Sequence, residues 1–120
     1  MDFPEHLRTL RKEARMSQRE LAERVDVDFT YLSKIENGRV EPPSETVLKK
    51  IAKELAVALG QDETELSDDL ITLAGKIPSD LAETLARNPQ AVQFLRSIGD
   101  DVRSPSEWQR LIRGRSQDQE

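Results

Sequence analysis

The sequence predicts an all-α protein, and three features of the chain indicate this. Apolar residues recur at intervals of three and four along five segments between residues 3 and 74, as they do on the buried face of a helix. Residues that favour helix N-caps stand before several of these segments, including Ser17, Asp28 and Ser44. Glycines such as Gly38 and Gly60 follow the apolar pattern and indicate where helices end. We therefore expect a five-helix N-terminal domain followed by short C-terminal helices.

Composition limits what the chain can be. With 120 residues, of which 36% are hydrophobic and 4% aromatic, it forms one small domain with an appendage at most. The chain has no cysteine, which excludes a disulfide scaffold and a thiolate zinc site. The net charge of -5 comes from the second half, because residues 1–60 carry 11 basic and 11 acidic residues and residues 61–120 carry 7 and 12.

The first helix is predicted over residues 3–15. Phe3, Leu7, Leu10 and Ala14 lie at helical spacing and form its buried stripe, while its other faces are basic. His6, the single histidine of the chain, is interpreted as a solvated helix residue, because a catalytic or metal role would need partners that the sequence lacks.

Residues 16–39 predict two short helices joined by a tight turn. Ser17 and Glu20 form a capping box for a helix over residues 17–25, and Asp28 caps a second helix over residues 28–36. Asp26 lies in the turn, where a left-handed backbone is tolerated, and Asn37-Gly38 ends the second helix. This arrangement is a helix-turn-helix.

Two more helices are predicted before residue 75. One begins after the cap Ser44 and ends at Gly60, and another covers residues 62–74 with an acidic first turn.

Residues 75–113 predict a C-terminal helical region, and residues 114–120 a disordered tail. Its helices begin near Ser79, after Pro89 and after Ser104, and each carries too few apolar residues to form a core alone. They must dock on a second copy of the chain, on the first domain or on another protein. Trp108 is the expected anchor of such a contact.

The helix-turn-helix resembles the DNA-binding domain of the phage repressor and Cro family, also called the Xre-type family. The resemblance covers about residues 4–60 and rests on Ser17-Gln18-x-Glu20-Leu21-Ala22 and on Val27-Asp28-x-x-Tyr31-Leu32-Ser33-x-Ile35-Glu36-Asn37-Gly38. It implies that residues 1–74 form the DNA-binding domain and that double-stranded DNA is the partner. It also implies a partly buried salt bridge between Arg11 and Glu36. Asp26 departs from the glycine that is usual in the turn.

The docking geometry of this family puts the second helix of the motif in the major groove, with its N-terminal turn foremost. Lys34 suits guanine, whereas Phe29 either touches a thymine methyl or folds back against the turn. If Lys34 does not contact guanine, it contacts a phosphate or is a solvated lysine. The predicted base contacts are Phe29, Thr30, Ser33 and Lys34. The predicted phosphate contacts are Gln18, Arg19, Tyr31, Asn37 and Arg39.

These expectations describe a cytoplasmic transcriptional regulator, most simply a repressor that binds a near-palindromic operator as a homodimer. An alternative is an antitoxin-type autorepressor whose acidic C-terminal helices bind a basic partner protein. A pure protein-interaction module would require an inactive DNA face. An enzyme is not expected, because the sequence shows no nucleophile–base pair, phosphate loop or metal-ligand cluster. No cofactor, metal or membrane segment is predicted.

Overall fold

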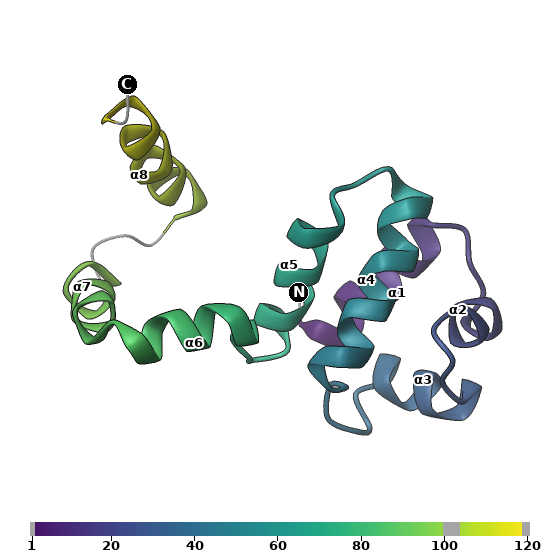
Figure 1. Ribbon diagram of the computed structural model, residues 1–120. Helices are drawn as coiled ribbons and strands as arrows, with labels where there is room; N and C mark the ends of the chain where they lie inside the picture. Colours follow the sequence, from purple (N-terminus) through teal and green to yellow (C-terminus); the bar gives the residue numbers. More distant parts are fainter. Residues whose placement is uncertain (1, 100–103, 119–120) are drawn as a thin grey trace. The chain divides into compact units, whose positions relative to one another are not determined.

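The computed structural model describes residues 2–99 and 104–118, and the regular structure in these residues is entirely helical (Figure 1). This confirms the predicted all-α fold class. The chain divides into two compact units, one that ends at Ser79 and one that begins at Asp80.

The first unit contains five helices (Figure 1). α1 contacts α3, α4 and α5, α2 packs on α3 and α4, and α4 lies along α5. A side chain caps each helix by accepting a hydrogen bond from a backbone N–H of the first turn. The helices are α1 (Phe3–Glu13), α2 (Gln18–Arg24), α3 (Phe29–Glu36), α4 (Glu45–Leu59) and α5 (Glu63–Leu73), and the caps are Asp2, Ser17, Asp28, Ser44 and Asp62.

One hydrophobic core lies inside these five helices. Every helix contributes the apolar face that its spacing predicted. Ala22 on α2 is 2% exposed, and its small side chain allows α2 to pack closely on its neighbours. The fully buried aliphatic residues include Leu7, Leu21, Leu32, Ile35, Leu48, Ile51, Leu55, Leu70 and Ile71.

Four helices of this unit end in the same way. The residue after each C-cap has a positive φ, and its N–H donates to a carbonyl of the last helical turn. The N–H of the following residue donates to the carbonyl one position earlier in the helix. This pair of hydrogen bonds is typical of a Schellman motif. Gly38 and Gly75 take this position after α3 and α5. Asp26 takes it after α2 with φ 57°, as predicted for the turn, and Arg15 takes it after α1 with φ 59°.

The chain after α5 returns to the start of α4. Lys76 Nζ donates to the carbonyl of the buried Pro43 at 2.9 Å. The backbone N–H and the hydroxyl of Ser79 both donate to Glu45 Oε1 at 3.1 Å. Because of these contacts the first unit extends to Ser79, five residues beyond the domain boundary that was expected at Ala74.

The second unit consists of α6 (Ser79–Arg87), α7 (Pro89–Gly99) and α8 (Pro105–Asp118). α6 and α7 contain no fully buried residue, and Leu85, Ala91, Val92 and Ile98 are half-buried. The sequence also predicts a turn at Gly99-Asp100-Asp101, and Asp100 and Asp101 lie outside the described residues. α8 continues through Gly114 to Asp118, where a disordered tail was predicted. A single glycine costs a helix only about 1 kcal/mol, and no proline follows it to stop the helix. The apolar side chains that this unit exposes include Leu81, Phe94, Leu95, Leu111 and Ile112.

Across the residues that the structure describes, none of the helices combines the length and the apolar character needed to cross a membrane.

Candidate nucleic-acid interface

A buried ion pair fixes the end of α3 against α1. Arg11 Nε donates to Glu36 Oε2 at 2.8 Å, and Arg11 Nη2 donates to Glu36 Oε1 at 3.0 Å. Glu36 is 1% exposed and Arg11 is 9% exposed. The bidentate geometry suits a planar guanidinium facing a carboxylate, so the pair sets the position of α3 as well as compensating two buried charges.

The same carboxylate also holds the start of α2. Gln18 Nε2 donates to Glu36 Oε1 at 3.1 Å. Arg11 Nη1 donates to the carbonyl of Met16 at 2.8 Å, just before the α2 cap. Glu36 therefore links α1, α2 and α3. Among the described residues no buried side-chain polar atom lacks a hydrogen-bond partner.

Arg8 is a member of this network that the sequence analysis missed. Its Nη2 donates to the main-chain carbonyl of Glu36 at 2.7 Å and to Asn37 Oδ1 at 3.2 Å. Asn37 Nδ2 in turn donates to Ser33 Oγ at 3.4 Å. Arg8 thus caps the C-terminal end of α3 and orients Asn37. The available signal was its position one turn before Arg11 on the same helix.

The outer face of α3 carries the residues that were predicted to face DNA. Phe29 and Ser33 lie on one row of the helix, and Thr30 and Lys34 lie on the next row. Thr30 and Lys34 are exposed, Ser33 is half-buried, and Phe29 is 37% exposed. The opposite face of α3, with Leu32, is in the core.

Phe29 is covered on one side by an arginine of α2. The guanidinium carbon of Arg19 lies 4.5 Å from the centroid of the Phe29 ring, which is a cation–π distance. The Phe29 residue is 37% exposed beside this guanidinium. Tyr31, two residues further on, is half-buried and packs against the core.

Some exposed cations of the first unit pair with carboxylates, whereas others, including Lys12, Arg15, Lys50 and Lys53, have no ion-pair partner among the described residues. Arg24 pairs with Glu20 and Glu54, and Lys49 pairs with Glu45. No carboxylate of the described residues pairs with the cations on α3 and beside it, which are Arg19, Lys34 and Arg39. The neutral N-terminal half thus presents unpaired positive charge at α3.

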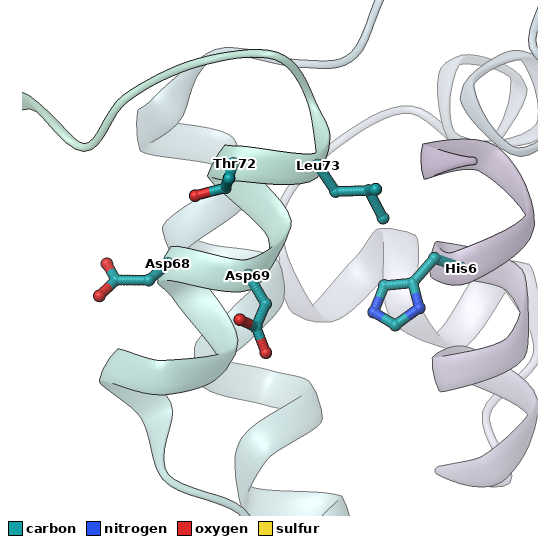
Figure 2. Close-up of a pocket in the computed structure, with 5 residues that line it drawn as sticks. All are labelled: His6, Asp68, Asp69, Thr72 and Leu73. Atoms are coloured by element: carbon teal, nitrogen blue, oxygen red, sulfur yellow. The ribbon is translucent and has the colours of Figure 1, made fainter. Parts of the chain in front are cut away.

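A separate hollow of about 480 Å³ lies between α1 and α5 (Figure 2). His6 extends into it from α1, facing Leu73 of α5, while Asp68 and Thr72 point away from the histidine. His6 is half-buried here rather than fully solvated. The described residues contain no group of three or more histidine, cysteine, aspartate or glutamate side chains that could hold a metal ion.

Comparisons with known proteins agree with this arrangement. Residues 7–61 match the family model described as helix-turn-helix. A similar protein is the HTH-type transcriptional activator BcrR of Enterococcus faecalis, which is 40% identical over 74 residues. That match covers 62% of this chain and 35% of BcrR, so the chain spans about a third of the length of this relative. No solved structure gave a significant match. With the buried Arg11–Glu36 pair and the α2–α3 packing in place, residues 7–61 belong to the helix-turn-helix family of the Xre type.

Proposed function

We propose that the chain is a sequence-specific DNA-binding transcriptional regulator that inserts α3 into the major groove. The observation that carries this proposal is the outer face of α3. Thr30 and Lys34 are exposed there and lie near the unpaired cations Arg19 and Arg39, while Glu36 holds the inner side of the helix. A rigid helix that presents donors and positive charge together suits a groove lined by base edges and phosphates.

The base contacts follow from the chemistry of this face. Lys34 can donate to O6 and N7 of guanine. Thr30, one turn earlier in the same row, can donate, accept or touch a thymine methyl, and Ser33 can do the same closer to the helix axis. Phe29 can make only an apolar contact, which favours a thymine methyl.

The phosphate contacts come from the rim around α3. Gln18 and Asn37 each use one amide hydrogen inside the protein, with Glu36 and Ser33, and keep a second one for a phosphate oxygen. Arg39 lies exposed just after α3. The Tyr31 hydroxyl and Arg19 are the other candidates for this role.

A homodimer is the assembly that α6 to α8 support best. These helices expose apolar faces and bury almost nothing, so another surface must cover them. Their charge is nearly balanced, since residues 80–120 carry 7 acidic and 6 basic residues. The remaining excess of acid in the second half of the chain belongs to the first unit, where α5 and its cap hold Asp62, Glu63, Glu65, Asp68 and Asp69. A near-neutral apolar surface suits a second copy better than a basic partner protein.

Dimerisation also explains how the domain can be specific. One α3 offers few base contacts, whereas two copies on half-sites about one helical turn apart add their contacts on a near-palindromic operator. Repression by occlusion of a promoter needs nothing beyond such binding. BcrR is named an activator, so an assay of transcription is needed to distinguish repression from activation.

The test is selection of binding sites from random DNA with the full-length protein, followed by transcription in vitro from a promoter that contains the selected site. We expect two related half-sites with a dyad between them and reduced transcription when the site overlaps the promoter. Selection that enriches no sequence contradicts the proposal. Increased transcription keeps the DNA-binding role and replaces repression with activation.

A further inference from the structure

We propose that Arg19 and Phe29 read DNA as one unit, in which Arg19 contacts a guanine next to the thymine whose methyl group touches Phe29. This inference rests on the proposed DNA-binding function and deepens it, because it assigns a base-specific role to a residue of α2. Without this base-specific role, an arginine at this position of α2 would serve only as a phosphate contact.

The two side chains come from different helices but are held in fixed register. Phe29 is the first residue of α3 and Arg19 is the second residue of α2. The bond between Gln18 and Glu36 ties the start of α2 to the end of α3, one residue from Arg19. The 4.5 Å stacking distance is therefore supported by the backbone positions of both helices.

The cation–π contact leaves the N–H donors of Arg19 available for hydrogen bonds. A guanidinium that stacks on an aromatic ring uses its flat face, and its N–H donors point outward in the plane. Among the described residues Arg19 is exposed and has no ion-pair partner. Its planar fork matches O6 and N7 of guanine, the commonest specific arginine contact in the major groove. Because the ring already orders the side chain, less conformational entropy is lost on binding.

Phe29 supplies the neighbouring contact. It opens the helix that enters the groove, and its side chain has no polar atom with which to bind a phosphate or a base edge. The residue is 37% exposed, and an apolar ring suits the C5-methyl group of thymine. A guanidinium and a ring in van der Waals contact fit two adjacent base pairs. The combined target is a guanine beside a thymine in each half-site.

The experiment is selection from random DNA with four full-length proteins: wild type, Arg19→Lys, Phe29→Ala and Arg24→Lys. Lysine keeps the charge of Arg19 but lacks the planar fork, so the guanine preference at one position of the half-site should fall, by at most the about 5- to 150-fold that a lost bidentate contact costs, while the other preferences remain. Arg24→Lys is the matched control on the same helix, where the arginine pairs with Glu20 and Glu54, and its selected site should equal that of wild type. Circular dichroism checks that each variant is folded.

A second measurement isolates Phe29. Replacing the neighbouring thymine by uracil removes only the methyl group, and the wild-type affinity should fall about fourfold. Phe29→Ala should bind the thymine and uracil sites equally. Arg19→Lys, which keeps the phenylalanine, should still distinguish them.

Two outcomes overturn the inference in distinguishable ways. If Arg19→Lys selects the same site as wild type, and Arg19→Ala weakens binding equally for all sequences and lowers the salt slope by about one, Arg19 is a phosphate contact. If the wild-type protein selects no sequence at all, the proposed function fails and the inference fails with it.

Discussion

Arg11 of α1 and Glu36 of α3 face each other in the interior, joined by two hydrogen bonds of 2.8 and 3.0 Å. The carboxylate also accepts a bond from Gln18, so three helices meet at one buried charge. Such a pair is a weak source of net stability while it is intact, but removal of one partner leaves the other charge buried and uncompensated. The position of α3, and with it the DNA-facing surface, therefore depends on Glu36.

We expect Glu36→Gln to lower the free energy of unfolding by about 3–5 kcal/mol. Glutamine keeps the volume of the side chain but leaves the Arg11 guanidinium without a counter-charge. Urea denaturation followed by far-UV circular dichroism measures the change.

The control is Glu20→Gln, which removes a carboxylate from an exposed pair with Arg24 and should cost less than about 1 kcal/mol. A double variant, Arg11→Met with Glu36→Leu, should recover much of the loss, because no charge is then left buried. Equal small losses at Glu36 and Glu20 would contradict the assigned role.

Lys34→Ala should weaken binding to the selected operator by about 1–3 kcal/mol and leave the unfolding free energy nearly unchanged. The side chain is exposed on the outer face of α3 and supports nothing in the core. Fluorescence anisotropy with labelled operator and unrelated DNA separates specific from non-specific binding. Lys53→Ala removes an exposed lysine of α4 as the control, and equal effects of the two variants would remove Lys34 from the base contacts.

Much of the first unit could be predicted because its signals are local. A cap such as Ser17 or Asp28 bonds to the backbone two or three residues later, and helical spacing decides which face is buried. The same rule placed Thr30 and Lys34 on the outer face of α3. The partnership of Arg11 with Glu36 came from the resemblance to the family, and the structure brings the two residues into contact.

The features that sequence reasoning missed depend on how helices pack. Arg8 reaches Asn37 across 29 positions of sequence, and Arg19 meets Phe29 only because α2 and α3 cross at a particular angle. Arg15 takes a left-handed backbone that is rare for its residue type, and only the bonds that close the α1 terminus require it. Apart from the position of Arg8 one turn before Arg11, no local pattern of residue types marks such contacts.

We expect the full-length protein to be a dimer that Phe94→Glu and Leu111→Glu convert to a monomer. Phe94 is 58% exposed on α7 and Leu111 is 46% exposed on α8, and a carboxylate at either place would be buried in a dimer without a partner. Light scattering at several concentrations measures the mass, and operator binding should weaken together with dimerisation.

Val57→Glu is the control for this experiment, because Val57 is 78% exposed on α4 in the first unit. A fragment of residues 1–79, which contains the whole five-helix core, should be monomeric. A wild-type protein that is already monomeric would contradict the homodimer and favour the antitoxin-type alternative, in which another protein covers α6 to α8.

The contact between Glu45 and Ser79 should depend on pH. The hydrogen bond from the Ser79 backbone N–H, with help from Lys49, holds the pKa of the Glu45 carboxyl below its ordinary value of 4.5. Because the folded pKa is the lower one, the ionised carboxylate stabilises this contact within the first unit above about pH 4.5, and this contribution is lost as the pH falls through the folded pKa. Carbon-13 NMR should show a lower titration midpoint for Glu45 in the folded protein than in the same protein unfolded in urea.

Ser79→Pro removes both donors at the first position of α6, where proline is tolerated, and should raise the Glu45 midpoint towards that of the unfolded chain. Identical midpoints in the folded wild type and in Ser79→Pro would mean that Ser79 does not hold the carboxylate.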